Sequence, residues 1–218
     1  MNQKPVILWD WNGTLLNDVA CCVKAMNLLL KVRNLPLLNK ATYREVFDFP
    51  VRLYYEKLGF DFQQEDFEVT AHQFMDHYNE LVLEVKIFTD ATPLLRQLQQ
   101  KGFRQFILSA MEQNLLDKLT EKHGIRTFFE GIHGINNHLA AGKLETAQKL
   151  FSSLNTSPNN CLLIGDSLHD AEVAAELDIP VLLFSQGHFS KIRLEKSCKA
   201  IAIDYQAIYA FIEKRYRL

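Results

Sequence analysis

The sequence predicts an α/β fold, in which helices cover both faces of a parallel sheet and a helical insertion interrupts the chain. Val6 to Trp9 is a short apolar run without polar alternation, which is typical of a strand buried on both faces. After Thr89, similar apolar runs alternate with helical patterns, as parallel sheets require. Between these regions, residues 16–83 contain helical patterns and no convincing strand.

Length and composition indicate an ordinary globular protein. The 218 residues suffice for one large domain, or for one domain that carries a smaller one. A hydrophobic content of 48%, with 15 Phe, supplies a core and excludes full disorder. The 24 Lys and Arg against 26 Asp and Glu argue against a nucleic-acid partner, which would require a basic surplus.

Neither a membrane span nor a secretion signal is expected. No apolar run reaches the roughly 18 residues of a transmembrane helix, and the N-terminus lacks the basic region of a signal peptide. The 4 cysteines form no Cys-x-x-Cys pair and are expected to be reduced thiols. We therefore expect a cytoplasmic protein.

The insertion begins just after the first strand, where Asn12-Gly13 signals a turn. Its expected helices are separated by two X-Pro pairs and Gly59. They span residues 18–33, 42–47, 51–58 and 65–83. Residues 16–83 are therefore predicted to form a small α-helical domain, and residues 1–15 and 84–218 the α/β core.

The remaining core elements follow in order, and Gly102 and Gly124 end two of the helices. The expected strands are 103–108, 161–164, 180–184 and 200–203, and the expected helices are 93–101, 112–123, 143–154, 170–177 and 205–214.

Polar residues follow three of the expected strands: Asp10, Ser109 and Asp166. Because ligands of open parallel sheets lie outside the carboxyl ends of the strands, these residues are predicted to meet in space. Lys143 begins the helix before the third of these strands, so it can reach the same edge. Asp170 lies in the first turn of the helix that follows.

Clustered carboxylates repel one another, and a hard cation such as Mg²⁺ would relieve that repulsion. Lys143, the Ser109 hydroxyl and the backbone N–H groups of the Gly13 turn suit a phosphate group. Mg²⁺, phosphate and a carboxylate together suggest phosphoryl transfer through an aspartyl-phosphate.

These residues resemble a known family. Asp10-Trp11-Asn12-Gly13-Thr14 resembles the Asp-x-Asp-Gly-Thr signature of the haloacid dehalogenase-like (HAD) hydrolases. Ser109, Lys143 and the segment 165–170 are similar to its second, third and fourth motifs, in order. The resemblance covers nearly the whole chain and implies a Rossmann-like core with an inserted helical cap. The phosphoglycolate-phosphatase branch is the most similar.

The resemblance also implies metal ligands and a nucleophile. Asp10 would be the nucleophile and a Mg²⁺ ligand, with the backbone carbonyl of Asn12 and the Asp166 side chain as further ligands. Asp170 would act through a metal-bound water or by holding Lys143.

The implied phosphate site consists of Ser109, the backbone N–H of Ala110, and Lys143, which would neutralise the transferring group. Within the cap, Arg52 is the candidate for binding a substrate carboxylate or second phosphate. The substrate would be a small phosphorylated metabolite, and the protein a monomer or homodimer.

Asn12 departs from the pattern, because HAD phosphatases usually carry Asp there as the general acid and base. Asn cannot exchange a proton at neutral pH. An enzyme with Asn there would lack general acid–base catalysis, which accelerates reactions about 10²–10⁴-fold. Three alternatives follow. The protein is a phosphatase that is slow or suited to good leaving groups, it has another activity such as C–P cleavage, dehalogenation or phosphotransfer, or it is a catalytically weak binding or regulatory domain. For the first, the resemblance implies that Asn12→Asp accelerates turnover on poor leaving groups.

Overall fold

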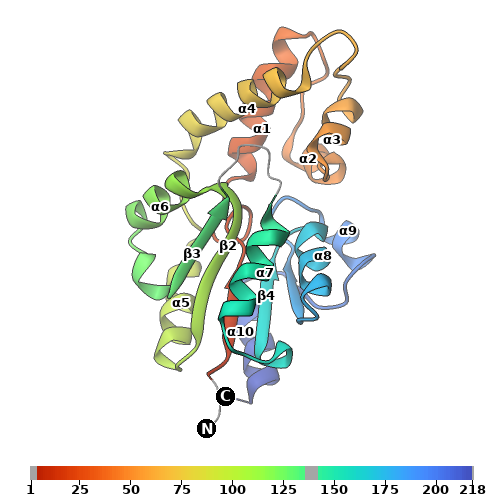
Figure 1. Ribbon diagram of the computed structural model, residues 1–218. Helices are drawn as coiled ribbons and strands as arrows, with labels where there is room; N and C mark the ends of the chain where they lie inside the picture. Colours follow the sequence, from red (N-terminus) through yellow and green to blue (C-terminus); the bar gives the residue numbers. More distant parts are fainter. Residues whose placement is uncertain (1–3, 136–141, 218) are drawn as a thin grey trace.

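The computed structural model describes residues 4–135 and 142–217 (Figure 1). Within them, one six-stranded sheet has the order β3-β2-β1-β4-β5-β6, and every neighbouring pair is parallel. The strands are β1 (Val6–Trp9), β2 (Arg104–Glu112), β3 (Gly131–Ile135), β4 (Cys161–Gly165), β5 (Val181–Phe184) and β6 (Ile201–Ala202).

Apart from α9, the described α-helices lie close to their predicted places. They are α1 (Val19–Val32), α2 (Lys40–Val46), α3 (Val51–Lys57), α4 (Phe67–Val82), α5 (Ala91–Gln100), α6 (Gln113–Lys122), α7 (Lys143–Ser153), α8 (Leu168–Glu176), α9 (Lys191–Glu195) and α10 (Tyr205–Tyr216). The predicted α/β fold class is confirmed by the parallel sheet and its flanking helices.

Two elements were absent from the prediction, and both are short. Strand β3 lies at the edge of the sheet, and two of its five residues are glycine. Because glycine disfavours strands, the sequence of this segment predicts a loop instead. Helix α9 has only five residues, too few for a helical period to show.

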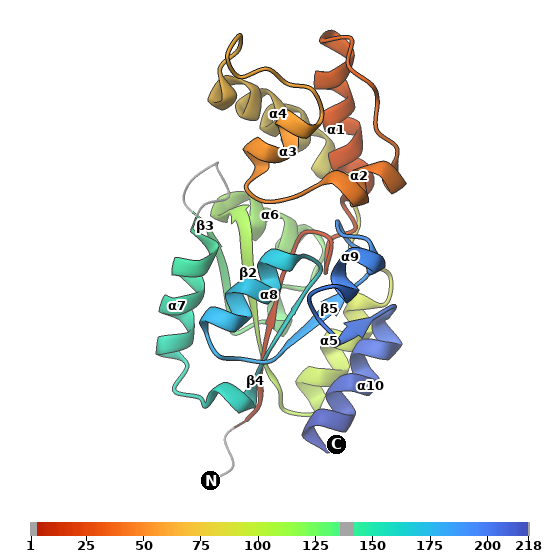
Figure 2. The same cartoon turned by 90° about the vertical axis from the view of Figure 1, so that its right-hand side faces the viewer.

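The continuous apolar pattern of β1 follows from burial on both faces. Ile7 and Trp9 join the larger core cluster with helices α5, α6 and α10. Val6 and Leu8 point the opposite way, into a second cluster with α7 and α8. Figures 1 and 2 show these two sets of helices on opposite sides of the sheet. All four side chains are fully buried.

The central position of β1 brings the candidate residues together. Trp9 is paired with Ile107 of β2 and with Ile164 of β4, so all three strands reach the same edge in register. The backbone N–H of Asp10 then donates to the carbonyl of Ile164 at 2.8 Å. The residues that follow β1 and β4 are thereby held side by side.

Helices α1–α4 lie together beyond the carboxyl ends of the strands, away from both termini (Figures 1 and 2). Two chain segments join them to the sheet, and these run beside each other. Phe88 N–H donates to the Leu15 carbonyl at 2.9 Å, and Asn17 N–H to the Lys86 carbonyl at 3.1 Å. The exact domain boundaries stay a prediction.

In residues 4–135 and 142–217, no helix combines the length and apolar character that a bilayer span needs. The cytoplasmic location stays a prediction.

We expect Ile164→Ala to lower the free energy of unfolding by about 2–5 kcal/mol, because it leaves a cavity in the centre of the sheet. Ile192→Ala is the matched control, since this side chain is 66% exposed and the expected change is within about 0.5 kcal/mol. Urea unfolding measures both. Similar losses in the two variants would contradict the assignment of the core.

Candidate active site

Four charged side chains converge at the carboxyl edge of the sheet. Asp10 follows β1, Asp166 follows β4, Asp170 lies in the first turn of α8, and Lys143 begins α7. The Lys143 ammonium donates to Oδ1 of Asp10 and, at 2.6 Å, to Oδ1 of Asp170. Oxygens of the three carboxylates lie within 4.8 Å of one another, and all three side chains are buried. The structure thus brings together the acidic residues and the lysine that the sequence selected.

Asp170 is fixed by bonds to its second oxygen. This Oδ2 accepts hydrogen bonds from the backbone N–H groups of Asp166 at 3.1 Å and Ser167 at 3.0 Å, and from the Ser167 hydroxyl at 2.6 Å. Together with Ser167 it forms the capping box that starts α8. Although burial opposes ionisation, Lys143 and these donors lower the pKa of Asp170. Asp170 is therefore a charged anchor for Lys143.

Glycine is required where the backbone passes the carboxylates. Gly13 has φ +72°, and a Cβ there would overlap the Asp166 carboxylate and the His188 ring. A Cβ on Gly165 would overlap the Asp170 carboxylate. The close packing of carboxylates in this loop cluster depends on these missing side chains.

The cluster carries more negative charge than its lysine neutralises. Burial raises the pKa of Asp10 to about 6 despite the neighbouring ammonium, and burial raises the pKa of Asp166 to about 8. Burial alone would lower the pKa of Lys143, but the negative charges of Asp10 and Asp170 have the larger effect and raise it. Lys143 therefore stays charged. When all three carboxylates are ionised, they and the one ammonium leave two negative charges. A hard divalent cation fits this oxygen-rich site in both charge and ligand type.

Asn12 is held by a fourth buried carboxylate, that of Asp18. Its Nδ2 donates to Oδ2 of Asp18 at 2.7 Å and to the Tyr78 hydroxyl at 2.8 Å. Tyr78, from α4, in turn donates to the same Asp18 oxygen at 2.8 Å. The Gly13 backbone N–H donates to Oδ1 of Asp18 at 2.9 Å. The amide is therefore oriented by Asp18.

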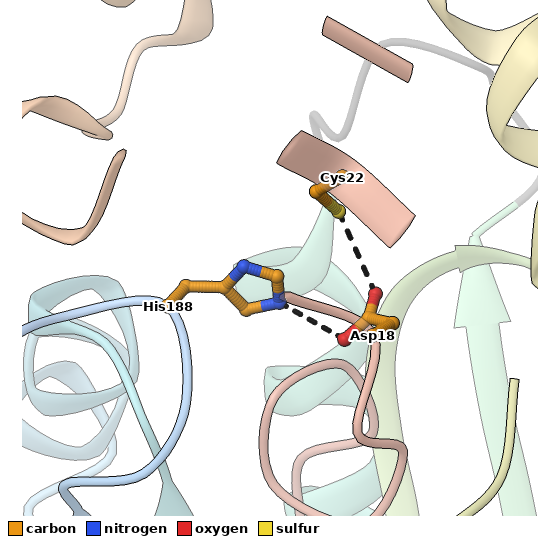
Figure 3. A group of neighbouring side chains, drawn as sticks. All are labelled: Asp18, Cys22 and His188. Carbon is orange, nitrogen blue, oxygen red and sulfur yellow. Dashed lines mark hydrogen bonds and ion pairs between the residues drawn. The ribbon is translucent and has the colours of Figure 1, made fainter. Parts of the chain in front are cut away.

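Asp18 also pairs with His188 (Figure 3). The Asp18 Oδ1 to His188 Nε2 distance is 3.1 Å, and the Cys22 thiol lies 3.7 Å from Oδ2. Although burial opposes both charges, the pairing lowers the pKa of Asp18 and raises the pKa of His188 to about 9. Nδ1 of His188 lies 2.8 Å from the Tyr43 hydroxyl.

This group resembles a metal site by residue type, but donors already surround the Asp18 carboxylate. We interpret it as a buried ion pair with supporting hydrogen bonds.

The sequence analysis did not select Asp18, Tyr78 or His188. His188 follows β5, and its backbone N–H donates to Asp166 Oδ2. The rule that selected the residues directly after the other strands would have found Ser185 there, because His188 lies four residues beyond the end of β5. In the sequence, Asp18 resembles any acidic residue that precedes a helix. Tyr78 lies in the middle of a helix, and no neighbouring residue indicates a role in a site.

A cavity of about 200 Å³ lies between the carboxylate cluster and helices α1–α4. Asp10, Asn12 and Ala110 line it. Ser109 is fully buried in β2, its hydroxyl accepts a hydrogen bond from Met111 N–H at 3.0 Å, and it is not among the described lining residues.

Arg52, the cap residue expected to bind substrate, is not among the described residues that line this cavity. Its guanidinium pairs with Glu56 at 3.2 Å, one turn further along α3. It also lies over the rings of Phe62 and Phe67, at 5.2 and 5.5 Å from their centroids. The aromatic residues around α3 therefore hold Arg52 on the outer surface of the helical layer.

Comparison with known proteins places the chain among hydrolases. A family model described as haloacid dehalogenase-like hydrolase matches residues 7–184. A phosphoglycolate phosphatase from Colwellia psychrerythraea is 26% identical over 82% of this chain and 84% of its own length. One from Mesorhizobium japonicum is 22% identical over 98% and 96%, respectively. The structure of a haloacid dehalogenase-like family hydrolase from Streptococcus pneumoniae superposes with a TM-score of 0.81 at 19% identity, covering 97% of this chain and all of that one.

We expect Mg²⁺ to raise the midpoint of thermal unfolding more at pH 8 than at pH 5. The pKa values of Asp10 and Asp166 in the folded protein lie above the ordinary value of 3.8. The folded protein therefore holds protons that the unfolded chain releases, and without metal its stability falls as the pH rises through this interval. A bound cation would offset that loss. Thermal melts with Mg²⁺ or EDTA test this, and Asp166→Asn should reduce the difference. Equal shifts at both pH values would contradict the metal assignment.

Proposed function

Because the chain belongs to the haloacid dehalogenase-like hydrolase family, we propose that it is a Mg²⁺-dependent phosphatase that hydrolyses a small phosphomonoester. One observation carries this proposal: Lys143 bridges Asp10 and Asp170 beside Asp166, and these side chains line a cavity. A lysine and three acidic side chains, all buried, combine a carboxylate nucleophile with sites for a cation and a phosphoryl group.

Asp10 would act as the nucleophile. One of its carboxylate oxygens forms a bond to phosphorus, and the bond from phosphorus to the leaving-group oxygen breaks. Asp10 then carries the phosphoryl group as an acyl phosphate. Water attacks the phosphorus, which releases inorganic phosphate and restores the carboxylate. Lys143, already directed at Asp10, would neutralise charge on the transferring group.

The metal would be held by Asp10, the Asn12 carbonyl and Asp166, and when bound it would supply positive charge to the phosphoryl oxygens. Asp170 would contribute mainly as a positioning residue, because Lys143 and the start of α8 occupy both of its oxygens. Ser109 and the Ala110 N–H would border the phosphoryl site from β2.

The cavity gives no support to C–P cleavage, which in similar enzymes uses a lysine of the cap. Lys143 is the lysine among the described residues that line the cavity, and it comes from the core. Lys57 of α3 pairs instead with Asp48 at 3.4 Å. A phosphotransferase or binding protein would differ from a phosphatase in holding the Asp10 phosphoryl group without hydrolysing it. The names of the two curated relatives make phosphoglycolate the first substrate to assay.

Asp10→Asn is expected to abolish Mg²⁺-dependent release of p-nitrophenol from p-nitrophenyl phosphate, because an amide cannot form the acyl phosphate. Asp76→Asn, an exposed residue of α4, is the matched control and should leave the rate unchanged. A colorimetric assay with Mg²⁺ and with EDTA measures both. Turnover by Asp10→Asn at the wild-type rate would exclude Asp10 as the nucleophile.

The contact between Asn12 and Asp18 changes what Asn12→Asp should do. The new carboxylate would lie about 2.7 Å from that of Asp18, and their repulsion would raise its pKa and disturb the loop. We therefore expect little gain on an alkyl phosphate from Asn12→Asp alone.

Combining Asn12→Asp with Asp18→Asn exchanges the two groups and removes the repulsion. We expect this double variant to hydrolyse alkyl phosphates at least about tenfold faster than Asn12→Asp, since general acid catalysis contributes about 10²–10⁴-fold. Steady-state kinetics on ethyl phosphate compares them, with Asp18→Asn as the control. A single variant as fast as the double would show that Asp18 does not hinder a carboxylate at position 12.

A further inference from the structure

The cavity wall formed by the helical layer is apolar and aromatic. It includes Met26 of α1, Tyr54 and Tyr55 of α3, and Phe74 and Met75 of α4. This wall and Asp10 line the same cavity, so a group bonded to the phosphoryl would contact the wall. A leaving group that fills this space would exchange water for aromatic and thioether contacts.

The arginines of residues 16–83 are all engaged elsewhere. Arg33 pairs with Glu65 at 2.6 Å, and Arg52 pairs with Glu56. Arg44 donates to the carbonyls of Ser185 and Phe189. None of the three is among the described residues that line the cavity. The helical layer therefore offers no guanidinium to a substrate carboxylate.

The charged groups that do line the cavity also disfavour an anionic leaving group. Lys143 is bound to Asp10 and Asp170, and the His188 imidazole is bound to Asp18. Glu112, at the start of α6, adds a further carboxylate to the wall. An additional carboxylate on the substrate would lose its hydration in this cavity, and the negatively charged side chains there would repel it.

We propose that the leaving group of the substrate is uncharged and apolar, with an aromatic ring as the group that best fits this wall. The proposal rests on the phosphatase function proposed above and departs from the substrate named for the curated relatives. The Tyr54 hydroxyl is buried and has no hydrogen-bond partner among the described residues, so it can bind one neutral polar group.

The chemistry of Asn12 favours the same substrates. Without an acid at position 12, departure is easiest for an oxygen that is stable as an anion. A phenolic oxygen meets that requirement far better than an alkyl one. An aryl phosphate therefore suits both the cavity wall and the departure step.

The test uses three phosphonates that cannot be hydrolysed and that differ only in the group at the far end of one ethylene linker. They are 3-phosphonopropionate, propylphosphonate and 2-phenylethylphosphonate, which end in carboxylate, methyl and phenyl. Calorimetric titration of the wild type with Mg²⁺ should give the phenyl compound at least about tenfold tighter binding than the carboxylate. Equal or tighter binding of 3-phosphonopropionate, or no binding of any of the three, would overturn the proposal.

Val51→Arg places a cation in the cavity wall and should reverse the preference toward 3-phosphonopropionate. Val69→Arg is the matched control, because Val69 is 57% exposed on α4 and is not among the described lining residues, and should leave the ratio unchanged. A ratio that Val51→Arg does not alter would place the phosphonate outside this cavity and overturn the proposal. These titrations need no turnover. Failure of the phosphatase function would instead appear as no phosphate release from any ester, phenyl phosphate and phosphoglycolate included.

Discussion

Mutual repulsion among Asp10, Asp166 and Asp170 is the constraint on which the rest of the site depends. Three carboxylates in one buried place are stable only if something neutralises them. Lys143 does so in part, and it reaches them because α7 begins at the same edge of the sheet. The parallel register of β1 and β4 brings the first two carboxylates together. Without that register, the charge that makes the site suitable for a cation would be dispersed in solvent.

A fourth buried carboxylate, that of Asp18, is stabilised differently. Neutral donors and the protonated His188 imidazole surround it, so it needs no metal ion. Its partners come from the loop after β1, from α4 and from the loop after β5, which ties the helical layer to the core. The side chain at position 12 therefore lies within a network shared by both parts. Its chemistry cannot be considered apart from that of Asp18.

Family membership and substrate preference depend on different parts of this molecule. The carboxylates, the lysine and the glycines lie at the carboxyl edge of the sheet, on its loops and on the first turns of α7 and α8, and they carry the motifs that resemble the family. The wall that would face the leaving group belongs to helices α1, α3 and α4. A relative's name can therefore describe the chemistry of phosphoryl transfer correctly and still leave the substrate undetermined.

The sequence by itself determined the α/β class, most element positions, and the meeting of Asp10, Asp166 and Lys143, because strand ends in a parallel sheet share one edge. It did not reveal β3, whose glycines disfavour a strand, nor the partners of Asn12. Only the tertiary structure decided that Asp18 holds Asn12 and that Arg52 lies outside the cavity. The physical reason is that such contacts join residues distant along the chain. Local patterns of hydrophobicity predict which helices and strands form, but they do not predict which side chains of different elements contact one another.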